Sequence, residues 1–349
     1  MLIKKLSIPF FLILIIPLLI VCGGGPAQKA SEMKPKPGLF DDPLKRYPNQ
    51  MYIASVGSGD TQEIAKDRAT GDIAKVIQAD IRLQQRLVEE YFESGTGADM
   101  KLEKSSNFNR QIDITAEQSL QNVNIGRTWL NENDGLYYAV AYMDRDETAT
   151  IYQQQLAKID ADVTTFYNGA QQSTEKLTRL AFINKAMALA VQRDVMTKQL
   201  NTISLGTQDF TPNVKPADLI MTRQAITRDI AVKLDLDYET WDEFPGAVGE
   251  VLQAFGFQIA EGEPDVTVTG NMKMTQLERE GYFVRWFVEL HFTDMSTAAK
   301  FLTYTDDDRE GSTSYGEAER RAAARMSRTV KRNLYERLDS YFATLMAGK

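Results

Sequence analysis

The chain of 349 residues has one cysteine, Cys22, and one histidine, His291, and these scarcities exclude several classes of protein. A single cysteine forms no internal disulfide bond, so the hydrophobic core must stabilise the fold. One histidine and one distant cysteine do not make up the usual sets of zinc ligands or a Cys-His nucleophile. The sequence therefore predicts no metal site and no cofactor.

Positive charge is also in short supply. The chain has 40 Lys and Arg against 48 Asp and Glu, which gives a net charge of -8. Proteins that bind nucleic acid in general carry a basic balance, so we expect no nucleic-acid partner. A hydrophobic content of 43% nevertheless favours a globular fold over disorder.

The longest hydrophobic run lies at the N-terminus. Lys4 and Lys5 precede Leu6–Val21, a run of about 16 uncharged residues that ends at Cys22. A short basic region followed by an apolar run is the layout of an export signal. A cysteine at the junction is typical of a bacterial lipoprotein, in which acyl chains such as palmitate on Cys22 anchor the protein to the membrane.

Two other interpretations of this run stay open. Leu19 fits the lipoprotein pattern, but Val21 is larger than the usual Gly, Ala or Ser before the cysteine. The run could be an uncleaved membrane anchor, although it is shorter than the roughly 18 to 20 residues that span a bilayer. Pro9 and Pro17 interrupt it as well. An ordinary signal peptide is the third interpretation, but no A-x-A-like site precedes Cys22.

The rest of the chain predicts two α+β modules joined by helices. We expect a signal peptide over 1–21, a tether rich in Pro and Lys over 22–49, an α+β domain over 50–145, a helical hairpin over 146–203 and a C-terminal α+β domain over 212–349. The fold class is therefore α+β, with two small modules that each combine a sheet and helices.

Periodicity predicts the elements of the first module. A strand over Met51–Val56 leads through Gly57-Ser58-Gly59 into a helix, for which Asp60 is the expected N-cap and Glu63 the N3 residue of a capping box. Apolar residues recur every four positions along one face of that helix (Ala65, Ala69, Ile73, Ile77 and Ile81). Further strands are expected over Gln111–Ala116, Val123–Leu130 and Leu136–Met143.

The second half has equally regular patterns. A helical hairpin is predicted over Arg145–Thr202, with its break at Asn168-Gly169. The C-terminal domain is expected to contain strands over 230–236, 257–260, 266–274, 282–292 and 301–304, a helix over 245–256 and a long final helix. The buried stripe of that final helix is predicted to be Ala318, Ala322, Met326, Val330, Leu334, Leu338, Phe342 and Leu345.

The main candidates for a catalytic or cofactor-binding site are Gly57-Ser58-Gly59 and His291. The glycine pattern lacks its third glycine, because Gln62 stands at that position, so a tight turn explains it better than a dinucleotide site. His291 is expected on the more polar face of a strand over Tyr282–Phe292, as part of a salt-linked, partly exposed surface. A Ser-His-Asp triad would need further support, and no G-x-S-x-G motif accompanies the histidine.

Two charged clusters have simpler explanations than a functional site. Asp306–Asp308 with Glu310 is expected to form a solvated acidic loop, since the spacing of an EF-hand is missing. Basic residues stud the final helix (Arg320, Arg321, Arg325, Arg328, Lys331, Arg332 and Arg337). We expect a solvated face with ion pairs, and docking to an acidic partner, peptidoglycan or phospholipid headgroups is the alternative.

The region Pro48–Arg145 resembles the Lpp-twenty lipoprotein family. The resemblance rests on Met51–Gly59 with its Tyr-x-x-x-x-Gly-x-Gly turn, on the Ala65–Ala74 helix, and on Trp129 followed by Leu136–Arg145. The family is associated with outer-membrane lipoproteins, and a similar module occurs in a periplasmic flagellar assembly protein. The resemblance implies a lipid-anchored location and supplies no catalytic residues.

These observations predict a lipoprotein anchored through Cys22 to the outer membrane, on its periplasmic face. Its expected role is non-catalytic: assembly, scaffolding or binding of an envelope protein partner. One alternative is a hydrolase of an envelope polymer that uses carboxylates such as Glu289 or Asp294. Another is a periplasmic ligand-binding module. No residue is predicted to be catalytic.

Overall fold

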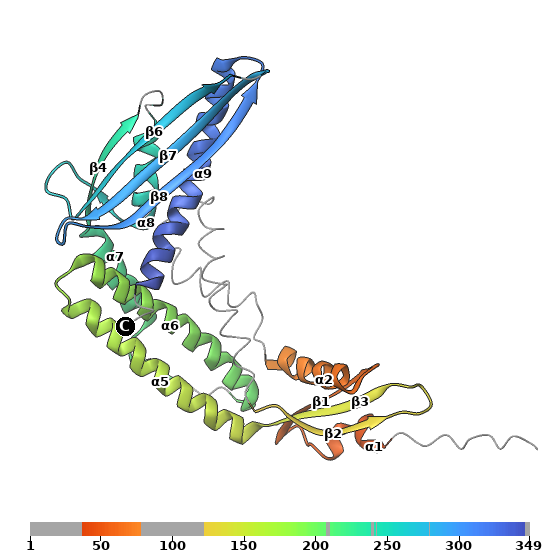
Figure 1. Ribbon diagram of the computed structural model, residues 1–349. Helices are drawn as coiled ribbons and strands as arrows, with labels where there is room; N and C mark the ends of the chain where they lie inside the picture. The colour runs from red at the N-terminus through yellow and green to blue at the C-terminus, as the bar shows by residue number, and fades with distance from the viewer. Residues whose placement is uncertain are drawn as a thin grey trace, which may run out of the picture. The chain divides into compact units, whose positions relative to one another are not determined.

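The computed structural model describes residues 37–77, 122–206, 210–238, 241, 243–278 and 280–345. Within these ranges the fold class is α+β, as the sequence predicts: two separate sheets are combined with helices (Figure 1). The signal segment with Cys22 and the strand expected over Gln111–Ala116 lie outside the described residues. The domain boundaries given above stay predictions.

The N-terminal sheet is antiparallel and has the order β1-β3-β2, with β1 (Tyr52–Gly59), β2 (Asn124–Leu130) and β3 (Tyr137–Asp144). Helix α2 (Gln62–Ile77) packs on one face of it. The apolar face of α2 is buried as predicted through Ala65, Ala69, Ile73 and Ile77, and Ile81, the last residue predicted on it, lies outside the described residues. Small residues along this face let the helix lie close to the sheet.

The N-cap of α2 is Thr61, one residue later than predicted. The backbone N–H of Ile64 donates to Thr61 Oγ1 at 3.2 Å. Strand β1 continues to Gly59, which leaves Asp60 in the turn between strand and helix. The capping box expected from Asp60 and Glu63 is therefore wrong by one position, because both Asp60 and Thr61 have a side chain that can cap a helix.

The other face of the N-terminal sheet is covered by residues 37–47, which we call the strap. It contains α1 (Gly38–Asp41) and the 3₁₀ helix η1 (Pro43–Lys45). Phe40 stacks on Trp129 with ring centroids 5.7 Å apart, and Tyr47 stacks on Tyr142 at 4.4 Å. Two buried aromatic rings thus fix the described end of the segment predicted as a tether over 22–49 to the sheet.

Helices α5 (Arg145–Gln172) and α6 (Lys176–Ile203) form the expected helical hairpin. The break lies after Gln172 and not at Asn168-Gly169. Gly169 is helical, and a Cβ there would lie 3.2 Å from the ring of Phe182 on α6. Gly169 therefore allows close contact between the two helices. From the sequence alone, a glycine in this role cannot be distinguished from a glycine in a turn.

A buried ion pair joins the two helices. Arg193 on α6 is 3% exposed, and its Nε donates to Asp160 Oδ1 on α5 at 2.6 Å. The guanidinium also donates to Asp194 and to the carbonyl of Phe210. These contacts compensate for the loss of water around the arginine.

We expect Asp160→Ala to lower the free energy of unfolding by about 2 kcal/mol, because it leaves a buried guanidinium with one fewer acceptor. Urea unfolding of the full-length protein measures this value. Asp162→Ala on the same helix is the matched control and should change it by less than about 0.5 kcal/mol. Equal effects of the two substitutions would contradict the role given to the ion pair.

The C-terminal sheet has five strands in the order β5-β4-β6-β7-β8. They are β4 (Ala231–Tyr238), β5 (Gln258–Ile259), β6 (Val266–Leu277), β7 (Tyr282–Asp294) and β8 (Ala299–Ser312). Strand β4 runs parallel to β5 and β6, and the remaining pairs are antiparallel. Long strands of this kind give the module a broad sheet with two distinct faces.

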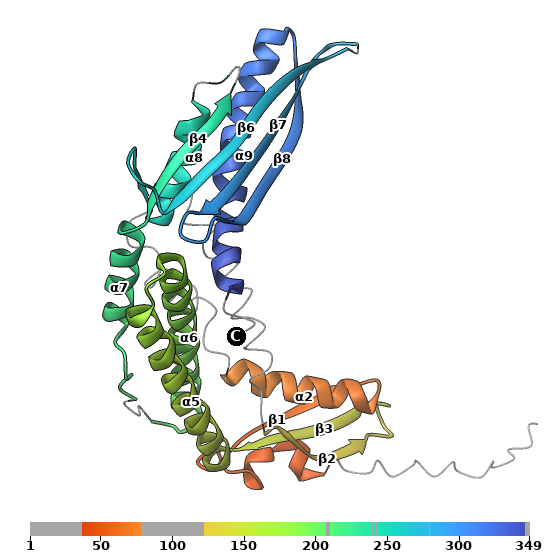
Figure 2. The ribbon, with the colours of Figure 1, turned by 60° about the vertical axis from the view of Figure 1, so that its left-hand side comes forward.

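Helices α8 (Phe244–Phe255) and α9 (Tyr315–Thr344) cover the same face of this sheet, and α7 (Pro216–Arg228) precedes β4 (Figures 1 and 2). Gly256 ends α8 in the left-handed conformation, with φ of 106°. The predicted stripe of α9 is confirmed from Ala318 to Phe342, since each of its seven residues is at most 1% exposed. The core of the module lies between this stripe, α8 and the sheet.

Candidate functional site

The face of the C-terminal sheet opposite α8 and α9 carries alternate side chains of the described strands, several of them polar, and we call it the open face. In β7 the side chains of Val284, Trp286 and Val288 are fully buried under the helices. The alternate residues Phe287 and Glu289 point to the open face and are partly exposed. This confirms the two faces that the alternation of β7 predicts.

His291 lies on the open face, as predicted. Its Nδ1 is 3.2 Å from Thr303 Oγ1 on β8, and its Nε2 is 3.5 Å from Glu289 Oε1. Both side chains of the latter pair are partly exposed. The contacts fit the expected salt-linked strand surface, and Glu289, one of the two carboxylates named for hydrolysis, has the histidine as a neighbour.

The acidic cluster Asp306–Asp308 with Glu310 lies on strand β8 and not in a loop, so that expectation is wrong. Alternation along the strand separates its carboxylates. Asp307 faces outward and accepts from Arg285 on β7 at 2.6 Å. Asp308 and Glu310 face the other way, and each lies 2.6 Å from the guanidinium of Arg325 on α9.

Asp306 belongs to a smaller network beside α9. It accepts from the hydroxyl of Tyr304 at 2.7 Å and from Asn333 Nδ2 at 2.9 Å. Burial of the phenol, together with this hydrogen bond and the charge of Asp306, raises the pKa of Tyr304 well above its usual range. The phenol therefore stays a neutral donor at any physiological pH.

Four of the basic residues of α9 contact acids within the same module. Arg320 and Arg321 pair with Glu317 one turn earlier, and Lys331 pairs with Glu250 on α8. Together with Arg325 these pairs agree with the expected face of ion pairs. The helix thus anchors β8 and α8 through charge as well as through its apolar stripe.

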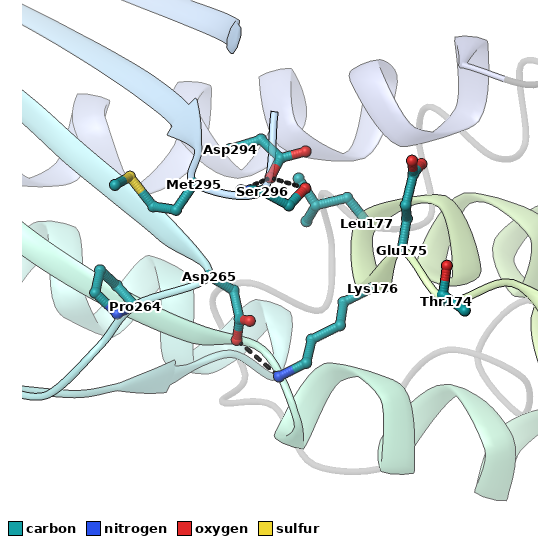
Figure 3. A pocket seen from close by; sticks show the side chains of 9 residues that line it. All are labelled: Thr174, Glu175, Lys176, Leu177, Pro264, Asp265, Asp294, Met295 and Ser296. Carbon is teal, nitrogen blue, oxygen red and sulfur yellow. Dashed lines mark hydrogen bonds and ion pairs between the residues drawn. The ribbon is translucent and has the colours of Figure 1, made fainter. Parts of the chain in front are cut away.

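A cavity of about 450 Å³ lies where the start of α6 meets two turns of the C-terminal sheet (Figure 3). The lining residues come from the α5–α6 connection, from the turn before β6 and from the turn after β7 (Thr174, Glu175, Lys176, Leu177, Pro264, Asp265, Asp294, Met295 and Ser296). Figure 3 shows Lys176 reaching across to Asp265.

Most polar groups of this cavity are already bonded to protein atoms. Lys176 Nζ donates to Asp265 Oδ2 at 3.0 Å and to the carbonyl of Asp229 at 2.6 Å. Burial lowers the pKa of Lys176, but the hydrogen bond and charge of Asp265 outweigh that effect, so the pKa is raised overall. Asp294 Oδ1 accepts from the N–H and the hydroxyl of Ser296, which is a turn-stabilising pattern.

We expect Lys176→Met to lower the free energy of unfolding by at most about 1 kcal/mol, because a third of the lysine side chain is exposed and water screens the pair. The loss should shrink further in 1 M salt. Thermal unfolding at low and high salt measures it, with Lys198→Met as the control. A loss that is insensitive to salt would show that packing and not charge holds this junction.

The glycines of Gly57-Ser58-Gly59 serve packing. A Cβ on Gly57 would lie 2.2 Å from the carbonyl oxygen of Ala65 on α2, and one on Gly59 would lie 2.5 Å from Ile64. Backbone contact this close needs glycine. The structure therefore supports the interpretation as a strand–helix junction over a phosphate-binding loop.

In the described residues, no group of three or more histidine, cysteine, aspartate and glutamate side chains is arranged to hold a metal ion. No helix in these ranges is long and apolar enough to cross a bilayer. The carboxylates Glu289 and Asp294 do not converge, since Asp294 lines the cavity while Glu289 lies on the open face.

No family profile and no curated protein matches this chain. Among solved structures, a secreted protein from Helicobacter pylori is similar at 12% identity, with a TM-score of 0.39, over 80% of this chain and 97% of its own. A minor lipoprotein from Acinetobacter baumannii is similar at 12% identity, with a TM-score of 0.24, over 30% of this chain and 92% of its own. A candidate lipoprotein from Caulobacter crescentus is similar at 11% identity, with a TM-score of 0.22, over 33% of this chain and 90% of its own.

The similar structures are thus those of a secreted protein and of lipoproteins. All three TM-scores are below 0.5, so the description of the fold rests on the elements given above.

Proposed function

We propose that this protein is a lipoprotein of the cell envelope that is anchored through Cys22 and binds a protein partner without catalysing a reaction. The export signal before Cys22 supports the location, and the resemblance of Pro48–Arg145 to the Lpp-twenty family supports the periplasmic face of the outer membrane. An acidic chain without a basic surplus fits a protein partner better than nucleic acid.

The observation that carries the binding role is the open face. Strands β4, β6, β7 and β8 present threonine, charged and aromatic side chains there, and α8 and α9 both lie on the opposite side. An open surface across several strands suits the standard interface between proteins, whereas small ligands favour enclosed pockets. The exposed Phe287 at its centre supplies the apolar contact that such interfaces use.

The positions of the candidate carboxylates favour this role over hydrolysis. General acid and base groups of a glycosidase must flank one bond. Glu289 and Asp294 sit five positions apart on β7, so alternation points them to opposite faces, and Asp294 also holds a turn through Ser296. We therefore expect no turnover of cell-wall polymers, and activity that disappears in Glu289→Gln would contradict the proposal.

Fatty-acid labelling in the native host tests the anchor. We expect wild-type protein to incorporate label and to fractionate with the outer membrane, and Cys22→Ala to lose the label. Absence of label on the wild type would mean that Val21 blocks processing. The protein would then be secreted or held by its uncleaved signal.

Site-specific photo-cross-linking tests the binding role. A photoreactive residue in place of Thr269 on the open face should form a discrete adduct in intact cells. The same residue in place of Lys158, an exposed position on α5, is the control. Adducts from the control position alone would refute the assignment of the open face.

A further inference from the structure

The strand register gathers positive charge at one end of the open face. Arg285 on β7 lies directly opposite Arg309 on β8, and Lys273 on β6 lies opposite Phe287. We call Lys273, Arg285 and Arg309 the basic patch. Asp307 pairs with Arg285 and is the carboxylate on β8 that faces the same side.

Negative charge gathers a few rows away on the same face. Asp235 and Asp237 are exposed on β4, where the intervening Leu234 and Leu236 pack toward the helices. Asp237, Asn271 of β6 and Glu289 form one row across the sheet. We call Asp235, Asp237 and Glu289 the acidic patch; Lys233, exposed on the same side of β4, borders it, so three carboxylates stand against one ammonium group there.

The basic and acidic patches occupy successive rows of the open face, because Lys273 and Phe287 share the row between Arg285 and Glu289. Glu289 and Arg285 are four positions apart on β7, which corresponds to about 13 Å along an antiparallel strand. Phe287, partly exposed, lies between the two rows. The open face is therefore dipolar, with an aromatic side chain near its centre.

The arginine pair is only partly compensated in a single copy, since Asp307, which pairs with Arg285, supplies one negative charge against two positive charges. Like charges directly opposite in neighbouring strands repel, and both Arg285 and Arg309 are exposed. Additional negative charge from outside would relieve this repulsion. Because the whole chain has a net charge of -8, two copies repel one another unless patches of opposite sign are matched.

We propose that two copies of this chain associate through their open faces about a two-fold axis, with the basic patch of each copy on the acidic patch of the other. A two-fold axis midway between two patches exchanges them, so one geometry forms both contacts at once. The proposal rests on the proposed function in using the same face, and it names the partner as a second copy.

The layout favours a second copy over an anionic membrane. A lipid surface of one sign would meet Asp235, Asp237 and Glu289 as well as the arginines. A partner that carries both signs at the matching spacing satisfies both patches. The chain itself provides such a surface.

A charge-exchange experiment with the full-length protein in detergent tests the proposal. One variant, Arg285→Glu with Arg309→Glu, makes both patches acidic, and a second, Asp235→Lys with Asp237→Lys, makes both basic. We expect wild type to dimerise in sedimentation at low salt and each variant alone to associate at least about tenfold more weakly. Mixed in differently tagged forms, the two variants should co-purify as a heterodimer.

Controls separate charge from misfolding. Arg320→Glu with Arg321→Glu changes the net charge equally on the exposed side of α9 and should leave dimerisation unchanged. If the new carboxylates beside Asp307 impair folding, Arg285→Ala with Arg309→Ala still should weaken the dimer, while circular dichroism reports the fold. The dimer should also weaken about tenfold between 0.05 M and 0.5 M salt.

Two outcomes would overturn the inference. Wild type that remains monomeric to about 100 μM excludes a dimer of useful strength. Failure of the mixed variants to associate, when wild type does, shows that the charges do not align as proposed. A monomer that still gives adducts with another protein at Thr269, or that binds anionic vesicles through Arg285, rejects self-association; the adducts would leave the binding role intact.

Discussion

Replacing Arg145 by methionine should lower the free energy of unfolding by about 3–5 kcal/mol, because several buried carbonyls lose their donor at about 1–3 kcal/mol each. The side chain is 5% exposed at the junction of β3 and α5. Its Nε donates to the carbonyl of Asn49 at 2.7 Å, and its Nη1 donates to the carbonyls of Thr202 and Ile203 at 3.0 and 2.7 Å. One guanidinium therefore ties the start of β1 to the end of α6.

The partners of Arg145 explain the size of the effect. Methionine fills similar space but leaves these carbonyls without a donor in a buried place. The carbonyls of Thr202 and Ile203 also form the negative end of the α6 dipole, which favours a cation there. Burial lowers the pKa of Arg145, as expected for a charge that has lost much of its water.

Chemical denaturation of wild type, Arg145→Met and Arg145→Lys measures this contribution. The free energy of unfolding of the lysine variant should lie between those of the other two proteins. An ammonium group keeps the positive charge, but it cannot donate to several carbonyls at once as the planar guanidinium does. Arg328→Met on the exposed side of α9 is the control, expected within about 0.5 kcal/mol of wild type. A loss below about 1 kcal/mol for Arg145→Met would show that water replaces the guanidinium.

Gly57→Ala should destabilise the N-terminal sheet by at least about 3 kcal/mol, the upper range for overpacking. Its new methyl group would lie 2.2 Å from the carbonyl oxygen of Ala65 and 2.4 Å from the nitrogen of Ala69. Both are backbone atoms of α2, so no side chain can rotate away. Either β1 or the whole helix must move.

Gly71→Ala, in the helix α2 against which Gly57 packs, is the matched control. A Cβ at Gly71 meets nothing within 4 Å, and alanine favours the helix by up to about 1 kcal/mol. The same chemical change should thus act with opposite sign at two glycines. Hydrogen exchange of β1 and β3 amides measures the local effect, and similar exchange in both variants would contradict the close contact assigned to Gly57.

Elements whose burial follows one period were predictable from the sequence. The four-residue stripe of α9 and the alternation of β7 both reflect a single covered face, and both are confirmed. Features that depend on which residue lies on the other side of a contact were not predictable from the sequence. Gly169 looks like a break until Phe182 is seen beside it, and Phe40 lies among prolines that suggest a linker.

The open face was predictable from the sequence only in part, for the same reason. Alternation along β7 predicted which side of the strand holds Glu289 and His291. That Arg309 lies opposite Arg285 depends on the register between β7 and β8, which includes an irregularity at Phe292 and Thr293. A shift of one residue would exchange the faces of every side chain in β8, so composition alone cannot locate the two patches.

The strap has a consequence for a protein anchored as proposed. Because Phe40 and Tyr47 are fixed to the sheet, the chain between Cys22 and Pro37 can extend over at most roughly 50 Å, whereas a free segment up to Asn49 could extend over roughly 90 Å. The contacts of these two aromatic rings then set the maximum distance between the bilayer and the folded part of the chain. Release of Phe40 and Tyr47 from the sheet would increase this maximum distance without changing the anchor at Cys22.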